Sequence, residues 1–125
     1  MAILMALPNY PDGRPTVNSN HVLNPQRIKF YIPKEVEDMK SPGLGSDGVY
    51  RDPWGSPYII TIDANGDGYC EDAFYRRESV SGTQATNGSF RLKTNVMIWS
   101  LGPDGMADRT KKGNEGVNKD NILSW

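Results

Sequence analysis

The stretch IDANGDGYCED, residues 62–72, carries oxygen-bearing side chains at alternate positions and a glycine after the third of them. Short carboxylate and amide side chains at this spacing can turn inward around one hard cation, because glycine admits the positive φ that such a loop requires. In the EF-hand template, oxygen ligands occupy positions 1, 3, 5, 7 and 9, and glycine occupies position 6. Gly68 matches the glycine. The matching ligands are Asp63, Asn65, Asp67, the Tyr69 carbonyl and Glu71.

The closing position of this loop departs from the template. Position 12, where a bidentate Glu is expected, is Phe74, so that role would pass to Asp72. The flanking segments have the composition of strands, whereas helices flank an EF-hand loop. Two interpretations therefore stay open: a calcium site with a different closure, or an acidic, solvated loop between two strands.

A second group of acids lies near the end of the chain, in SLGPDGMAD and NKDNILSW. Its carboxylates are Asp104, Asp108 and Asp120, and the nearby backbone carbonyls that could also coordinate belong to Leu101 and Met106. A loop of about 20 residues without secondary structure is costly to order in a small domain unless something organises it. A bound hard cation would do so. On spacing alone, calcium is a weaker hypothesis here than at the first loop.

Other chemistries are poorly supported. The net charge is −1 and the basic residues are scattered, which argues against binding to a phosphate backbone. Cys70 and His21 are the only residues of their types, so we expect no intramolecular disulfide, zinc site or nucleophilic triad, and we interpret Cys70 as a small semi-buried side chain. The acids lack the apolar pocket that a glycosidase requires. We expect Trp54, Trp99 and Trp125 to pack in the core or against turns. An enzyme is the least favoured class.

Turn signals and apolar patterning predict the elements that would position these loops. DPWG at 52–55 has the composition of a type I β-turn. Three short segments rich in β-branched or aromatic residues are interpreted as strands: 57–62, 73–77 and 96–101. The first two would form an antiparallel pair across the acidic loop, and the third would be a central strand.

Two segments are expected to be helical. Residues 1–7 favour a helix that Pro8 ends, and residues 34–39 favour one short helical turn. The chain from 8 to 29 is predicted to be irregular, and the polar run at 78–89 to be a long mobile loop.

Length and composition set the fold class. A chain of 125 residues with 37% apolar residues, 13 glycines and 9 prolines predicts one loop-rich α+β domain with a modest core. The apolar run at 2–7 is far shorter than the 18 or more residues that a membrane-spanning helix needs, and it lacks the basic region and cleavage site of a signal peptide.

Three motifs, in this order, resemble the globular domain of the major pseudopilins of type II secretion, the general secretion pathway protein G family. They are DPWGSPY at 52–58, IWSLGPDG at 98–105 and DNILSW at 120–125. In that family an Asp-Pro-Trp-Gly turn opens a sheet, and a Ser-Leu-Gly-x-Asp-Gly loop closes on a terminal Asp-Ile and Trp. Any one motif alone is unspecific, whereas the ordered set is specific.

The resemblance implies a pilin-like fold, in which a long N-terminal helix packs on a small antiparallel sheet with long ordered loops. The first half of that helix is an apolar segment that spans the membrane and forms the core of a helical filament, and this segment is missing here. Residues 1–7 would be the remnant of the helix. Residues 1–125 would form a single periplasmic domain, with the full-length protein anchored in the inner membrane before assembly.

The resemblance also implies calcium, because an ion organises the loop after the last strand in that family. By position, the first half of the site is supplied by the Leu101 carbonyl, Asp104 and the Met106 carbonyl, and the second half by Asp120. The family often has acids one and three residues before the Ile, where this sequence has Asn121 and Lys119, and residues 109–112 form a basic insertion. Asp108 or Asn118 would then substitute in the second half.

The acidic loop at 63–72 is not part of the usual short family hairpin. It resembles an elaboration of some pilin-like relatives, which have an Asp-x-Asn-x-Asp stretch at this place. A second calcium ion, with Asp72 in the closing role, is the expectation for it.

The leading hypothesis is a structural subunit of a type II secretion pseudopilus with no catalysis of its own. Such a subunit assembles with like subunits and other pseudopilins and works with inner-membrane components of the secretion machinery, without nucleic acid. The alternatives are a type IV pilin or minor pilin for adhesion, motility or DNA uptake, and a secreted calcium-dependent glycan-binding module that uses exposed Trp and Tyr side chains.

Overall fold

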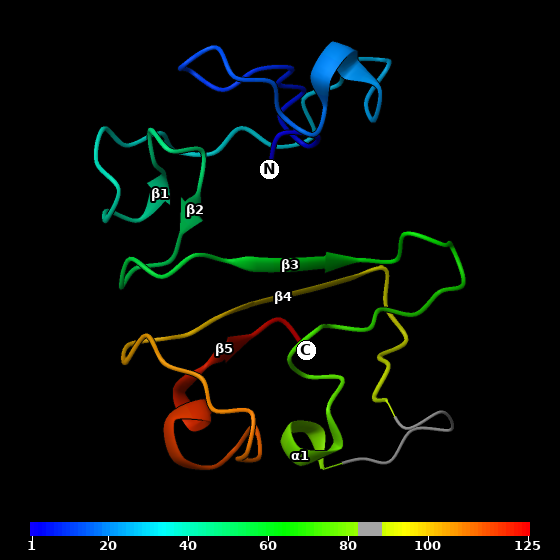
Figure 1. The fold of residues 1–125 in the computed structure, drawn as a ribbon, viewed down its shortest axis with the longest axis vertical. Helices are drawn as coiled ribbons and strands as arrows, with labels where there is room; N and C mark the ends of the chain where they lie inside the picture. Colours follow the sequence, from blue (N-terminus) through cyan, green and yellow to red (C-terminus); the bar gives the residue numbers. More distant parts are fainter. Residues whose placement is uncertain (83–88) are drawn as a thin grey trace. The chain divides into compact units, whose positions relative to one another are not determined.

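The computed structural model describes residues 1–82 and 89–125. Its contacts divide the chain into two compact units, Met1–Pro57 and Tyr58–Trp125 (Figure 1). Each unit has its own small antiparallel sheet. The expected single domain stays a prediction.

Unit 1, residues 1–57, is mostly loop. Its elements are the 3₁₀ turn η1 (Ser19–His21) and the paired strands β1 (Gly43–Leu44) and β2 (Tyr50–Arg51). The buried amide of Asn24 ties its loops together, donating to the carbonyl oxygens of Ile3 at 2.9 Å and Ile28 at 2.7 Å. Such side-chain bonds replace the backbone ladders that a loop-rich segment lacks.

Two helical predictions in unit 1 are wrong. Residues 1–7 form turns, and Ala6 leaves the right-handed helical region with a φ of 54°. Residues 34–39 are not helical either, because Glu35 forms a parallel bridge with Leu44 of β1. In both places local composition favours a helix that the longer-range contacts do not allow.

The predicted turn at 52–55 is confirmed. The Gly55 N–H donates to the Asp52 carbonyl at 3.1 Å, and the buried Asp52 carboxylate accepts the N–H groups of Trp54 and Ser56 at 2.9 and 2.8 Å. An Asp side chain that accepts backbone N–H groups stabilises a tight turn.

A second carboxylate in unit 1 pairs with the guanidinium of Arg51, whose side chain is only 10% exposed. The Arg51 Nη1 atom lies 2.9 Å from the Asp47 Oδ1 atom. This charge-assisted bond lowers the pKa of Asp47 to about 2. The ion pair stabilises the β1–β2 connection while the Asp47 carboxyl group is ionised.

Unit 2, residues 58–125, is built on a three-stranded antiparallel sheet with β4 at its centre (Figure 1). The strands are β3 (Ile59–Ile62), β4 (Val96–Ser100) and β5 (Ile122–Leu123). In this register Ile60 lies opposite Ile98, and Trp99 lies between Ile59 and Leu123. The predictions of a strand at 57–62 and of a central strand at 96–101 are confirmed, with bounds shorter by one or two residues at their ends.

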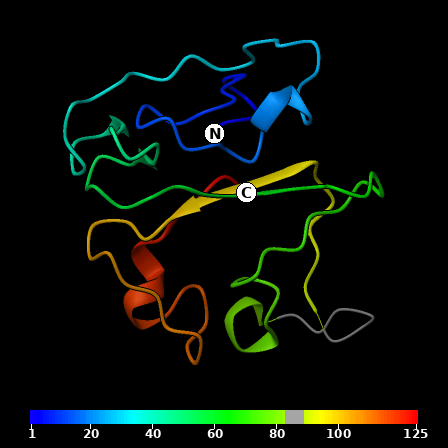
Figure 2. The same ribbon diagram turned by 45° about the horizontal axis from the view of Figure 1, so that its top comes forward.

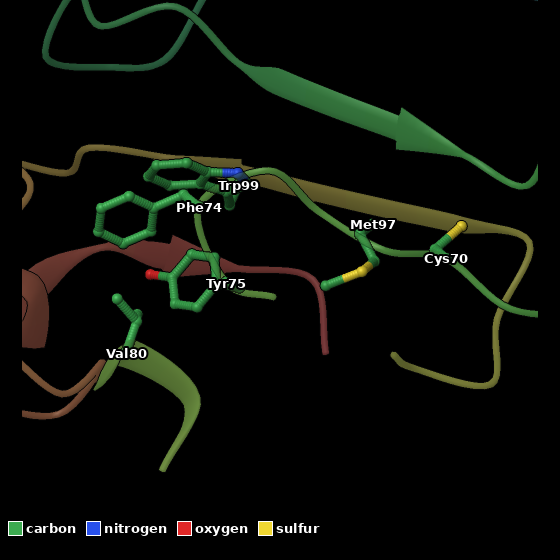
Figure 3. Close-up of a cluster of buried hydrophobic side chains, with 6 residues drawn as sticks. All are labelled: Cys70, Phe74, Tyr75, Val80, Met97 and Trp99. Atoms are coloured by element: carbon green, nitrogen blue, oxygen red, sulfur yellow. The ribbon is translucent and has the colours of Figure 1, made fainter. Parts of the chain in front are cut away.

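One face of this sheet carries the core of unit 2. Met97 and Trp99, two residues apart on β4, are 0% and 3% exposed. They pack with Cys70, Phe74, Tyr75 and Val80 (Figure 3). The rings of Phe74 and Trp99 are stacked at 5.1 Å, and Tyr75 meets Trp99 edge-on at 5.1 Å. Burial raises the pKa of the Cys70 thiol, as expected for a packed side chain.

The predicted strand at 73–77 is wrong. These residues form turns, and the partner of β3 is β4. Phe74 and Tyr75 are both buried although they are adjacent, an arrangement that a strand with one face on the core does not allow. The sequence then enters a short helix, α1 (Glu78–Ser81), where we expected a loop. The remainder of that expected loop, at 83–88, lies outside the described residues.

The mixed α+β class is thus supported in its coarse form, as two small antiparallel sheets with very little helix. A second 3₁₀ turn, η2 (Gly116–Asp120), leads into β5. Within residues 1–82 and 89–125, no helix has the length and apolar character to cross a membrane.

Candidate metal-binding loops

The acidic loop after β3 wraps around the carboxylate of Asp63. Its Oδ1 atom accepts the N–H of Gly66 at 2.8 Å, and its Oδ2 atom accepts the N–H of Gly68 at 2.8 Å. Asn65 and Asp67 accept further N–H groups within the same loop, so each of the first three predicted ligands bonds the backbone of the loop. Hydrogen bonding to the backbone gives this loop its shape.

Arginines balance part of the negative charge of the loop. Arg91 lies 3.4 Å from the carboxylate of Asp67, and its guanidinium stands 4.6 Å from the ring centre of Tyr69. Arg76 lies 3.1 Å from the carboxylate of Glu71. The repulsion expected among the acids is therefore relieved by backbone donors and guanidinium groups of the protein itself.

Asp72, expected to close the cage, occupies the core of unit 2, where it is 1% exposed. Its Oδ1 atom accepts the N–H groups of Phe74 and Tyr75 at 2.9 and 3.0 Å. Its Oδ2 atom accepts the Thr61 hydroxyl at 2.9 Å and the Trp99 indole N–H at 3.2 Å. The bonds that the described residues give this carboxylate all go to the core, so Asp72 joins β3, β4 and the turn after the loop.

In the C-terminal loop, residues 101–121, the two ends of the loop come together (Figure 2, orange to red). The N–H of Asp104 lies 3.3 Å from the Asp120 carboxylate, Oδ2. Gly102, at a φ of 65°, packs directly against the carbonyl of Asp120, where no side chain would fit. The motif glycine thus allows the first turn of the loop to approach its last residues.

The middle of this loop is held by Asn118, which is 1% exposed. Its Nδ2 atom donates to the carbonyls of Asp108 and Lys111 at 2.8 and 2.9 Å, and its Oδ1 atom accepts the Asp108 N–H at 2.7 Å. The Asp108 carboxylate bonds Thr110, whose hydroxyl and N–H lower the pKa of Asp108. Asn118 therefore stabilises the loop as a hydrogen-bond centre, and Asp108 points to Thr110.

Asp120 fits a cation better than the other predicted residues of this loop, because the Asp104 carboxylate accepts the Met106 N–H at 2.8 Å through its Oδ1 atom. Asp120 Oδ1 is buried and has no hydrogen-bond partner within the described residues, and such an oxygen is costly to leave unpaired. A hard cation prefers carboxylate and carbonyl oxygens of this kind. Leu101 packs against the core of unit 2, whereas Met106 is 55% exposed.

Neither loop brings enough acidic side chains together to surround a metal ion by themselves. Among residues 1–82 and 89–125, no three His, Cys, Asp or Glu side chains are grouped to hold a metal ion. A site at Asp104 and Asp120 would need backbone carbonyls and water as its other ligands. Calcium binding at both loops stays a prediction.

The tryptophans have different environments. Trp99 is buried in the core, as expected, whereas Trp54 is 51% exposed and Trp125 is 37% exposed. The ring of Trp125 meets that of Tyr75 edge-on at 5.2 Å.

The chain matches no protein-family model, no curated protein and no solved structure.

Proposed function

We propose that this chain is the globular part of a pilin-like structural subunit, which assembles into a type II secretion pseudopilus and catalyses no reaction. The proposal places it in the periplasm, anchored in the inner membrane before assembly. Its partners would be like subunits, other pseudopilins and inner-membrane components of the secretion machinery.

The observation that carries this proposal is the second face of the sheet in unit 2. This face is largely apolar on all three strands, with Ile60, Ile62, Val96, Ile98 and Ile122 on it, and its polar member is the buried Ser100 opposite Ile122. Ile62 is 59% exposed, Val96 40% and Ile122 46%. A sheet with one face on its own core normally presents polar residues on the other face. Apolar side chains on both faces are typical of a sheet that another element covers.

A long helix laid across this face would bury these side chains, as in the pilin-like architecture. Burial of apolar area stabilises by roughly 25 cal/mol per Å², so a helix with one apolar stripe is a suitable cover. Residues 1–7 do not form that helix. The proposal therefore rests on unit 2 and on the order of the three motifs, which supply the turn before β3, strand β4 with its loop, and strand β5.

Calcium at the C-terminal loop belongs to the same proposal. Asp104 and Asp120 would hold the ion, which would neutralise their charge and fix the two ends of the loop against each other. A rigid loop on the subunit surface suits a protein whose role is to pack against copies of itself.

Disruption of the gene in its host, followed by complementation, tests the proposed function. We expect secreted proteins to accumulate in the periplasm of the disrupted strain, and wild-type protein to restore their export. The variant Ile62→Glu should fold, because the side chain is largely exposed, and yet should fail to restore export, because it places a charge on the face that the helix covers.

The matched control is Lys93→Glu, an exposed position outside that face, which should restore export fully. Unchanged export after disruption, with loss of adhesion, motility or DNA uptake, would assign the subunit to a type IV pilus instead. Unchanged behaviour in all of these assays would refute a pilin-like role.

A further inference from the structure

A cleft in unit 2, lined in part by the middle of the C-terminal loop, has the lining of a binding site. Its volume is about 450 Å³, and the side chains that matter for recognition are Tyr75, Val80, Phe90, Lys112, Asn114 and Trp125. All of them lie in the described part of the chain. The cleft is large enough for a ligand of one or two rings.

Hydrogen bonds join the segments that form the walls of the cleft. The Gly113 N–H donates to the carbonyl of Val80 at 2.8 Å, and the Ser79 hydroxyl donates to the carbonyl of Arg109 at 2.7 Å. Gly113 also approaches the Tyr75 ring so closely that a Cβ atom there would lie 3.3 Å from it. The backbone at 112–114 is thus fixed against α1 and the core before any ligand arrives.

Aromatic rings form the apolar side of the cleft. The Tyr75 ring is buried and its hydroxyl accepts a bond from Asn121, so the ring is held in one position. Trp125 packs edge-on against it while remaining 37% exposed. An indole ring held in this way and open to solvent can stack on a flat apolar ligand face.

The polar side of the cleft carries a single kind of charge. Lys112 is the only charged side chain among those that line it in the described structure, and none of the lining side chains is a carboxylate. The neighbouring residues Arg109 and Lys111 add positive charge along the same segment. One ammonium group suits a single carboxylate, whereas phosphate recognition normally uses an Arg fork or several converging N–H groups.

We propose that this cleft binds a ligand that combines a flat apolar ring face with a carboxylate, the ring stacking on Trp125 and the carboxylate pairing with Lys112. Two sources share that chemistry: a uronic acid unit of a polysaccharide and an aromatic carboxylic acid. Binding does not require calcium, because no acidic residue takes part.

Titration of the full chain in a chelator-containing buffer, followed by calorimetry and ligand-detected NMR, tests the proposal. The probes are trigalacturonate, the neutral sugar maltotriose, and benzoate. We expect binding of one or both carboxylated probes and none of maltotriose. Tighter binding of trigalacturonate identifies the polysaccharide source, and tighter binding of benzoate identifies the aromatic acid.

Two variants assign the binding to this cleft. Lys112→Gln should weaken binding about fivefold and reduce its salt dependence, and Trp125→Ala should weaken it about tenfold. Lys93→Gln and Trp54→Ala, matched exposed positions elsewhere, should leave it unchanged. Lys112 is exposed, so the effect of Lys112→Gln on binding can be measured even if Trp125→Ala is unstable. Failure of both carboxylated probes to bind, or equal binding by wild type and Lys112→Gln, would overturn the proposal.

Discussion

Replacement of Gly102 by Ala should unfold unit 2 in urea at markedly lower concentration than wild type. Gly102 has a φ of 65°, and a Cβ atom there would overlap the backbone carbonyl oxygen of Asp120. Both contacting groups belong to the backbone, so no side-chain rotation relieves the overlap. We expect a loss of roughly 3 kcal/mol or more, from the left-handed conformation together with the displaced loop.

Gly66→Ala is the matched control, because Gly66 has a φ of 71° and no atom within 4 Å of a Cβ placed there. It carries the conformational cost alone, about 1 kcal/mol. Equal losses in the two variants would show that the approach of Gly102 to Asp120 does not exist in solution.

The second large effect is expected from Asp72→Ala. This change leaves the Thr61 hydroxyl, the Trp99 indole N–H and two backbone N–H groups of the buried turn without their acceptor. Unpaired buried donors are expensive, and we expect a loss of roughly 3–5 kcal/mol in the free energy of unfolding. Chemical denaturation followed by tryptophan fluorescence measures it directly.

Asp67→Ala provides the comparison for this variant. Its carboxylate is 40% exposed and takes part in a surface ion pair with Arg91, so its removal should cost less than about 1 kcal/mol. A small effect of Asp72→Ala, similar to that of Asp67→Ala, would contradict the assignment of Asp72 to the core.

The elements that the sequence predicted correctly are those in which one local signal dominates. The segment 96–101 is apolar except for Ser100, and its first five residues become the central strand, because both of its edges pair and one face is in the core. The turn at 52–55 follows from Asp, Pro and Gly at their preferred positions. At 59–62, β-branched residues between turn signals suffice.

The errors arose where contacts distant in sequence decide the local structure. The segment 73–77 has aromatic residues that suit a strand, yet the bonds that Asp72 makes to Thr61 and Trp99 fold it into a turn. The local sequence does not indicate that Thr61 and Trp99 are the partners of Asp72. Residues 1–7 favour a helix by composition, but Ala6 adopts a positive φ. Propensity is a weak predictor when tertiary contacts compete with it.

The site residues show the same limit. The alternating carboxylate and amide side chains of Asp63, Asn65 and Asp67 predicted an ion site, and in the structure all three accept backbone N–H groups of their own loop. The sequence does not indicate the structural role of Asn118, because an asparagine in a polar, glycine-rich run is typical of a solvated loop residue. Its role depends on Asp108 and Lys111, seven or more positions away.

Calcium dependence of thermal unfolding tests the central claim, a C-terminal loop that an ion fixes at Asp104 and Asp120. An ion that binds only the folded chain stabilises it by about 2.7 kcal/mol at 100 times its dissociation constant. We therefore predict a melting temperature several degrees higher in calcium than in chelator, with the difference markedly smaller in Asp104→Asn/Asp120→Asn and any remainder removed by Asp63→Asn/Asp67→Asn. The same melting temperature of the wild-type chain in calcium and in chelator, or a calcium effect that is undiminished by the loss of Asp104 and Asp120, would contradict the account.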